Sequence, residues 1–252
     1  VIMGANIGTT VTAWLISLLG FKVSIAAFSI PLMALAIPFI FSSKSKRKSI
    51  GEFIMGFAFL FMGLEFLKNA VPDLQANPEI LSFLSRYTDL GFGSVLIFLL
   101  VGTILTVVVK SSSATMAITL IMCAKGWIPF ELGAAMVLGE NIGTTITANI
   151  AALPANVSAK RAAFAHLTFN IFGVIWMLIV FYPFIRMISS LVANYGPGDP
   201  TQLSAFSNSI DPQTLSLISN PDATGLTPEQ KALQGQLMNY QVATSYGLSL
   251  FH

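Results

Sequence analysis

Two ten-residue stretches, "GANIGTTVTA" from Gly4 to Ala13 and "GENIGTTITA" from Gly139 to Ala148, decide how this chain is interpreted. They agree at eight of ten positions although 135 residues separate them. Both are rich in Gly, Asn and Thr, which are poor helix formers and are costly in an apolar environment. A chain that keeps the same polar stretch twice is expected to use it at two related positions of its fold.

The rest of the chain is apolar. Hydrophobic residues make up 54% and charged residues 10% of the 252 positions, whereas soluble domains carry roughly 25% charged residues. Together with a mean hydropathy of +0.76, this predicts an all-α polytopic membrane protein. A net charge of +2, without a basic stripe interleaved with aromatics, argues against a nucleic-acid partner. The single cysteine, Cys123, excludes an internal disulfide.

Several apolar segments approach or exceed the length of about 20 residues that a helix needs to cross a bilayer. They are residues 1–20, 22–41, 51–71, 91–125, 130–153 and 162–188. A further helix is expected to start within 236–252. The chain opens without a methionine and stops within an apolar stretch, so we interpret it as part of a longer chain.

Charge in the loops sets the expected orientation. The basic loop "SSKSKRKS" at 42–49 is predicted to be cytoplasmic, and the polar, acidic loop at 191–235 to be extracytoplasmic. Two full crossings by 91–125 and 130–153 would then end on the wrong side of the membrane. We therefore expect 91–125 to form a re-entrant helical hairpin with its tip near 110–113.

The same count of crossings places the two motif copies in opposite directions. This is typical of an inverted-repeat secondary transporter with broken helices. Residues 1–41 are then the end of a first repeat and 50–190 are the second repeat. The expected location is the plasma or inner membrane, which the chain crosses several times.

The motif residues suit an ion site. Glycines allow close approach of a ligand or a second helix, and unwound carbonyls with Asn and Thr oxygens are hard ligands for sodium. Helix N-termini offer N–H groups to an anion. The alternative is that "GANIG" and "GENIG" are only packing faces of the small-xxx-small kind. The second copy and the serines at 111–113 favour the ion site.

The residues "GANIGTT", "GENIGTT" and "KSSSAT" resemble the bacterial and type II sodium/phosphate cotransporter family, whose two repeats each carry a QSSS-type hairpin followed by G-x-N-I-G-T-T. The stretch "RAAFAHLTFNIFG" at 161–173 is similar to the helix after the second repeat. The resemblance runs from residue 1 to about residue 190 of the sequence. In three respects the chain departs from the family pattern: the first hairpin would precede Val1, Lys110 replaces the family glutamine, and the segment after residue 190 has no counterpart.

The resemblance implies sodium-coupled symport of inorganic phosphate by alternating access, with sodium as the coupling ion and without another cofactor or metal. The residues expected to bind phosphate are Lys110, Ser111, Ser112, Ser113, Thr10 and Thr145. The residues expected to bind sodium are Asn6, Thr9, Asn141, Thr144 and Glu140. The expected partners are phosphate, sodium and the lipid bilayer. The sequence leaves open whether the chain forms a homo-oligomer.

Two side-chain pairs and two alternative functions complete the expectations. An ion pair between Lys110 and Glu140 is a hypothesis, since ionisable residues within a membrane are functional candidates. His166 and Asn170, four apart on one helix, are predicted to be a hydrogen-bonded packing pair, with a proton relay as the alternative. The motifs of hydrolases and nucleotide-binding enzymes are absent from the sequence, so an enzyme is not expected. The alternatives are a non-transporting sensor or scaffold, and an anion channel in which Lys110 is the selectivity residue.

Overall fold

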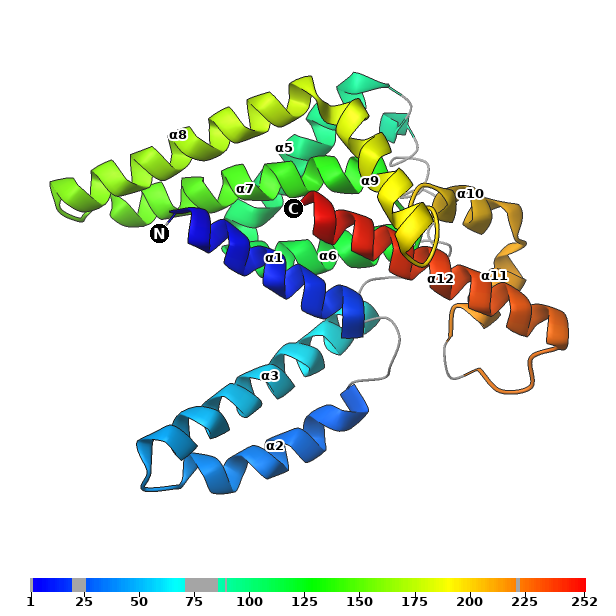
Figure 1. The fold of residues 1–252 in the computed structure, drawn as a ribbon, viewed down its shortest axis with the longest axis horizontal. Helices are drawn as coiled ribbons and strands as arrows, with labels where there is room; N and C mark the ends of the chain where they lie inside the picture. Colours follow the sequence, from blue (N-terminus) through cyan, green and yellow to red (C-terminus); the bar gives the residue numbers. More distant parts are fainter. Residues whose placement is uncertain (1, 20–25, 71–85, 89, 221–222) are drawn as a thin grey trace. The chain divides into compact units, whose positions relative to one another are not determined.

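A computed structural model describes residues 2–19, 26–70, 86–88, 90–220 and 223–252, and every regular element within them is a helix (Figure 1). The helices are α1 (Ile2–Leu19), α2 (Ala26–Ile40), α3 (Ser45–Ala70), α5 (Phe92–Val109), α6 (Ser112–Ala124), α7 (Phe130–Ala152), α8 (Val157–Ile179), α9 (Phe181–Tyr195), α10 (Gln202–Ser209), α11 (Pro212–Ile218) and α12 (Pro228–Phe251). The prediction of an all-α chain is confirmed.

The chain divides into two compact units, Leu18–Asp73 and the remainder. In the smaller unit, α2 and α3 form an antiparallel hairpin (Figure 1). A side chain added at Gly51 of α3 would place its Cβ 2.6 Å from the backbone nitrogen of Ile40, so the two helices meet closely after the turn. Helix α3 begins at Ser45, within the expected loop 42–49, because its basic residues are exposed and need no loop to reach water.

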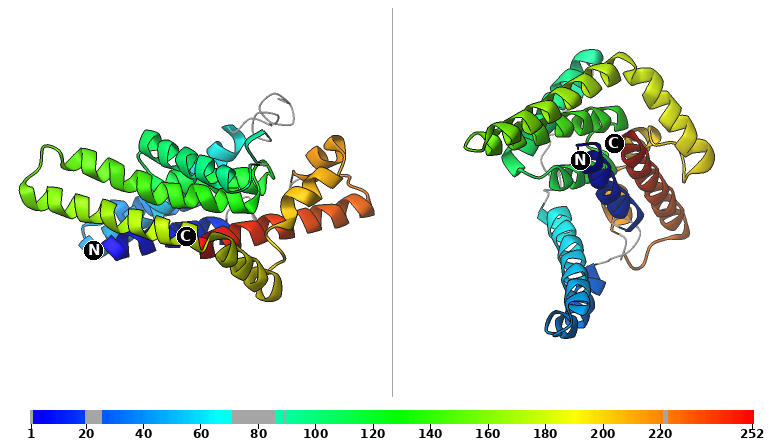
Figure 2. Two further views of the ribbon diagram at one scale, coloured as in Figure 1. Left: turned by 90° about the horizontal axis from the view of Figure 1, so that it is seen from above. Right: turned by 60° about the vertical axis from the view of Figure 1, so that its left-hand side comes forward.

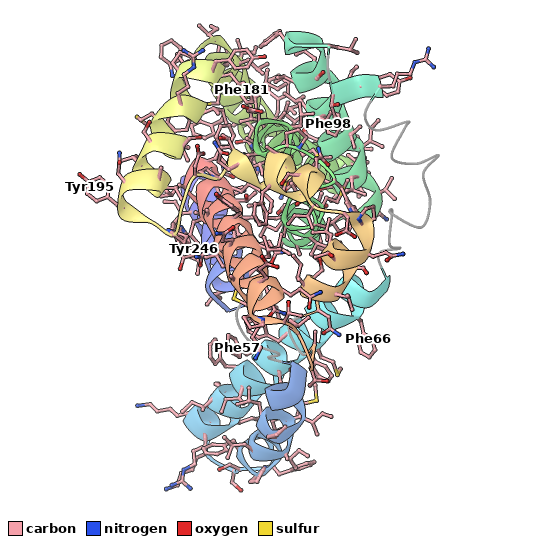
Figure 3. The ribbon with its side chains drawn as sticks, turned by 90° about the vertical axis from the view of Figure 1, so that its right-hand side faces the viewer. Phe57, Phe66, Phe98, Phe181, Tyr195 and Tyr246 are labelled. Carbon is pink, nitrogen blue, oxygen red and sulfur yellow. The ribbon has the colours of Figure 1, made fainter. Side chains whose placement is uncertain are left out.

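The larger unit is organised around α7. Gly102 of α5 lies against Met136 of α7, and Gly143 of α7 lies so close to α5 that an added Cβ would sit 2.7 Å from the carbonyl oxygen of Thr103. The hydroxyl of Thr103 donates to the carbonyl of Gly139 at 3.0 Å. Phe98 of α5 is buried in this unit (Figure 3). The glycines of the second motif copy thus form the packing face between α5 and α7.

The expected interruption at "KSSS" is present. Lys110 ends α5 in the left-handed conformation, at φ 58°, and its N–H donates to the carbonyl of Thr106 at 2.8 Å. Ser111 then begins α6 as its N-cap. Helix α6 runs antiparallel to α7, since Thr119 contacts Glu140 and Cys123 lies against Gly133. Helix α5 runs parallel to α7, so α5 and α6 form a helix–break–helix pair.

Length and hydropathy single out α5 and α8 as the described helices able to cross a membrane, whereas α6 is shorter. The other segments expected to cross do not pass this test within the described residues. The expected ends at residues 20 and 71 lie outside the residues that the structure describes.

The segment expected to be one helix over 162–188 is two helices. Helix α8 starts at Val157, capped by Asn156, whose side chain accepts from the N–H of Ala159 at 2.9 Å. The helix ends at Ile179, and α9 starts at Phe181. Pro183 explains the break, because it has no N–H to donate to the carbonyl of Ile179 and its ring would clash with that carbonyl. Figure 2 shows α8 alongside α7 before this break.

The segment 191–235, expected to be a polar loop, contains α10, α11 and the start of α12. Asp211 caps α11 and is followed by Pro212, a common first helical residue. Hydrogen bonds from the side chain and backbone of Thr214 hold the pKa of Asp211 below its usual range, so the cap stays charged at neutral pH. The buried members of a small core here are Leu203, Leu215, Ile218 and Leu237. This segment, although mostly polar, therefore packs around a small apolar cluster.

Helix α12 starts at Pro228, eight residues before the expected start at 236. Thr227 and Gln230 form a capping box, in which the Thr227 hydroxyl accepts from the N–H of Gln230 and the Gln230 side chain accepts from the N–H of Thr227. The sequence "TPEQ" carries this signature. The polar first turns of α12 explain why hydropathy alone places its start too late.

We expect Gly139→Ala to destabilise the protein by about 1–3 kcal/mol, because the added Cβ would overlap the backbone of α5 at Leu99 and Thr103. Gly173→Ala in α8 is the matched control, since no other heavy atom lies within 4 Å of its added Cβ. Thermal unfolding in detergent measures both. Equal stability of the two variants would show that α5 and α7 do not meet at Gly139.

Candidate functional site

Both copies of the repeated motif are helical. Gly4 to Ala13 lies within α1 and Gly139 to Ala148 lies within α7, and neither helix is interrupted there. The expectation of unwound carbonyls in the motif is therefore wrong for the described residues. The break of this fold lies instead at Lys110 and Ser111. A Cβ added at Gly4 or Gly8 meets no other heavy atom within 4 Å, unlike the packed glycines of the second copy.

Three motif threonines have a carbonyl of their own helix within reach of the hydroxyl. Thr144 donates to the Glu140 carbonyl at 2.9 Å, Thr145 to Ile142 at 2.7 Å and Thr10 to Asn6 at 3.2 Å. A hydroxyl whose hydrogen is engaged in this way keeps only its oxygen lone pairs, which can bind a cation but cannot donate to an anion. Thr145 is fully buried, whereas Thr9 and Thr144 are half-buried. The hydroxyl oxygens of Thr144 and Thr145 thus keep lone pairs that can accept.

Asn170 of α8 joins the two motif copies. Its side-chain oxygen accepts from the side-chain amide of Asn6 at 3.0 Å, and its own amide donates to the backbone carbonyl of Asn141 at 3.0 Å. Helices α1 and α7 run in opposite directions here (Figure 1). The sequence paired Asn170 with His166, which is wrong: both ends of the Asn170 amide bind the motifs, and His166 Nε2 is buried without a hydrogen-bond partner.

Glu140 faces α6 and is completely buried. Its Oε1 accepts from the hydroxyl of Thr119 at 2.7 Å, while its Oε2 is buried without a partner. Lys110 is exposed at the start of the α5–α6 break, and no ion pair joins these two described residues, so the hypothesis of a Lys110–Glu140 pair is wrong for this conformation. Among the residues expected to bind sodium, Asn6 and Thr9 lie on α1, whereas those of the second copy fall on two faces of α7, with Glu140 toward α6 and the Asn141 carbonyl toward α8.

The N-terminal turn of α6 holds the three serines. The hydroxyl of Ser111 accepts from the N–H of Ala114 at 3.2 Å, and the backbone N–H groups of Ser112 and Ser113 have no partner among the described residues. The side chains of Ser112 and Ser113 are half-buried. Because α6 and α7 are antiparallel, this turn lies toward the C-terminal half of α7, which carries Thr144. The structure therefore brings the expected serines and this threonine to the same end of the helix pair.

A polar seam between α1 and α12 was not assigned from the sequence. Thr10 Oγ1 lies 2.9 Å from Nδ1 of His252, and Ser17 donates to the Ser245 carbonyl at 2.9 Å and pairs with the Ser249 hydroxyl at 2.7 Å. Ser245, Ser249 and His252 are four and three residues apart, which is the spacing of one helix face and is a signal that the sequence contains. This seam fixes Thr10 against α12.

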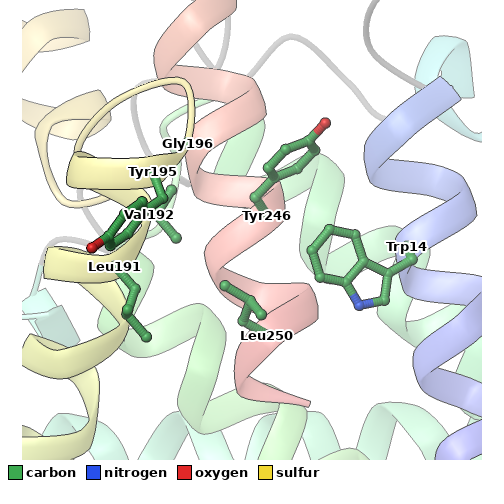
Figure 4. A pocket seen from close by; sticks show the side chains of 7 residues that line it. All are labelled: Trp14, Leu191, Val192, Tyr195, Gly196, Tyr246 and Leu250. Carbon is green, nitrogen blue, oxygen red and sulfur yellow. The ribbon is translucent and has the colours of Figure 1, made fainter.

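One pocket of about 370 Å³ lies beside that seam (Figure 4). Its wall combines Trp14 of α1, Tyr246 and Leu250 of α12, residues 191, 192 and 195 of α9, and Gly196, which caps α9. The rings of Trp14 and Tyr246 are 5.5 Å apart. The lining is apolar and contains none of the residues expected to bind phosphate or sodium, so the pocket is distinct from the candidate ion site.

An apolar helical chain with paired Asn–Gly–Thr motifs and a serine-capped helix break has the character of a membrane transporter. Residues 1–69 and 76–196 match the family model described as Na+/Pi-cotransporter. The chain belongs to the Na+/Pi-cotransporter family, which is a family of transporters and not of enzymes. The family membership predicted from the sequence is thereby confirmed.

Three individual proteins are similar to this chain at lower levels of sequence identity. The "Uncharacterized protein YqeW" of Bacillus subtilis is 28% identical over 209 residues, covering 82% of this chain and 63% of its own length. The "Putative inorganic phosphate export protein YjbB" of Salmonella typhimurium is 26% identical over 194 residues, covering 76% and 33%. The "Sodium-dependent phosphate transport protein 2C" of Mus musculus is 36% identical over 111 residues, covering 42% and 18%. The chain thus spans less than two thirds of each relative, and no solved structure matches it.

Lys110 offers a test of backbone strain at the break. A left-handed conformation costs an L-residue roughly 1–2 kcal/mol, so we expect Lys110→Gly to stabilise the protein by about 1 kcal/mol after the extra chain entropy of glycine. Lys110→Arg keeps both the strain and the charge and serves as the control. Thermal unfolding in detergent compares the two variants. A glycine variant no more stable than the arginine variant would rule out strain at this residue.

Proposed function

We propose that the protein transports inorganic phosphate together with sodium across the membrane. The observation that carries the proposal is the serine-capped start of α6, where two backbone N–H groups and the neighbouring hydroxyls remain available. A helix N-terminus with open N–H groups is a favourable place for a phosphate anion, because the helix dipole adds to the hydrogen bonds. Ser111, Ser112 and Ser113 then hold the anion, and Lys110 adjoins them in sequence.

Sodium is proposed to bind the acceptor oxygens described above. Glu140 supplies a buried carboxylate oxygen without a partner, and the hydroxyl oxygens of Thr144 and Thr145 retain lone pairs. Asn6, Thr9 and Thr10 supply the oxygens of the first copy. A sodium ion in a site of low dielectric offsets the charge of the phosphate, which is the physical reason for coupling the two. The split of these residues between two faces of α7 supports more than one cation position.

For the mechanism we propose alternating access, which the same geometry supports. The antiparallel pair α5–α6, broken at Lys110, supports a re-entrant hairpin. The opposite directions of α1 and α7 support an inverted repeat, in which one repeat moves against the other to alternate access. We propose that the chain crosses the membrane several times and opens its site to one side of the membrane at a time.

The direction of transport is set by the gradients and not by the site. One relative is named for phosphate export and another for sodium-dependent phosphate transport. A site that binds sodium and phosphate together can run either way, because binding free energies are reciprocal between coupled ligands. We therefore propose that this protein couples the transport of sodium and phosphate. Under an inward sodium gradient the expected direction is phosphate uptake.

The experiment is phosphate flux into proteoliposomes that contain the complete protein, with and without a sodium gradient. We expect saturable, sodium-dependent flux that Ser112→Ala reduces by about tenfold or more, because the variant loses the Ser112 hydroxyl as a hydrogen-bond donor to the anion. Ser216→Ala, an exposed serine of α11, is the control. Non-saturating flux would indicate a channel, and no flux of phosphate or arsenate would indicate a sensor or scaffold.

Glu140 is tested separately. Glu140→Gln keeps the size of the side chain and its acceptor for Thr119 but removes the charge, so we expect the sodium concentration for half-maximal flux to rise about tenfold or more. Glu229→Gln, at an exposed position near the start of α12, controls for the loss of one negative charge. An unchanged sodium dependence in Glu140→Gln would remove Glu140 from the proposed sodium site.

A further inference from the structure

Asn170 hydrogen-bonds to both copies of the repeated motif. It lies on α8, is 4% exposed, and its two contacts to Asn6 and Asn141 are each 3.0 Å long. Neither motif copy supplies it, and the proposed phosphate and sodium ligands do not include it. Its position between α1 and α7 calls for a role beyond helix packing.

The hydrogen bonds define how the two amides are turned. The backbone carbonyl of Asn141 can only accept, so the atom of Asn170 that faces it is the donor Nδ2. The oxygen Oδ1 of Asn170 therefore faces Asn6, and Asn6 must turn its own NH₂ group toward it. This leaves Oδ1 of Asn6, an acceptor, for a ligand. A backbone carbonyl of the second copy thus decides, through Asn170, which atom the first copy presents.

We infer that Asn170 is a positioning residue that sets the sodium affinity by orienting Asn6 and holding it beside the second motif copy. The inference rests on the proposed function, since it assigns Asn6 to a sodium site. An acceptor oxygen held in a fixed orientation binds a hard cation without losing further side-chain entropy. Without Asn170, the Asn6 amide can turn either its NH₂ group or its oxygen toward the ligand.

Asn149 provides a matched comparison within the chain. Its amide also donates to two backbone carbonyls, of Thr145 at 2.8 Å and of Ala163 at 2.9 Å. These bonds join α7 to α8 but do not reach α1. Replacing Asn149 therefore removes a similar amide bridge while leaving the orientation of Asn6 intact.

The experiment is a double-mutant cycle on sodium dependence, measured as phosphate flux by the complete protein in proteoliposomes. We expect Asn6→Ala and Asn170→Ala each to raise the half-saturating sodium concentration about tenfold, with a smaller change in maximal rate. The double variant is expected to show about the same tenfold rise and not about a hundredfold one, because both changes remove the same oriented oxygen. Asn149→Ala is expected to change it by less than about threefold.

Losses that multiply in the double variant, or an equal sodium shift in Asn149→Ala, would overturn the role of Asn170 while sodium-dependent transport stands. Flux without any sodium dependence in the unchanged protein would overturn the proposed function and this role with it. Asn170→Ser keeps a polar group too short to bridge both partners, so the same sodium shift is expected. It serves as the test variant if Asn170→Ala does not fold.

Discussion

The contact between α5 and α7 is the constraint on which the larger unit depends. Two apolar helices gain little from hiding apolar surface in a membrane, so they associate through close packing and a few hydrogen bonds. Gly102, Gly139 and Gly143 supply the closeness, and the Thr103 hydroxyl on the Gly139 carbonyl supplies the hydrogen bond. Once α5 is held there, the break at Lys110 returns the chain along α7, and α6 is placed where Thr119 meets Glu140.

The same packing explains how one motif presents both glycines and polar groups to its neighbours. In an α-helix the residues of "GENIGTT" point to different sides, so the glycines face α5, the Glu140 carboxylate faces α6 and the Asn141 carbonyl reaches α8. The packing reading and the ion-site reading of the motif are therefore not exclusive alternatives. Glycine gives the close approach, and the positions between the glycines carry the polar groups.

The sequence predicted the all-helical class, the family and the interruption before the serines, because composition, a repeated motif and a serine cluster are local signals. It did not predict the Asn170 bridge or the seam from Thr10 to His252, because these join residues 164 and 242 positions apart. Hydropathy also misplaced the end of α8 and the start of α12. In both places the controlling residues, Pro183 and the box of Thr227 with Gln230, act through backbone hydrogen bonds and not through hydrophobicity.

The two motif copies differ where Ala5 in the first stands opposite Glu140 in the second. Two halves that share a backbone pattern but not this carboxylate cannot exchange roles at equal energy. Under the alternating access proposed above, the two conformations that open the halves to opposite sides of the membrane therefore differ in free energy even without a gradient. The proposed cycle thus carries a preference for one side of the membrane, and the difference between Ala5 and Glu140 is its source within the motif.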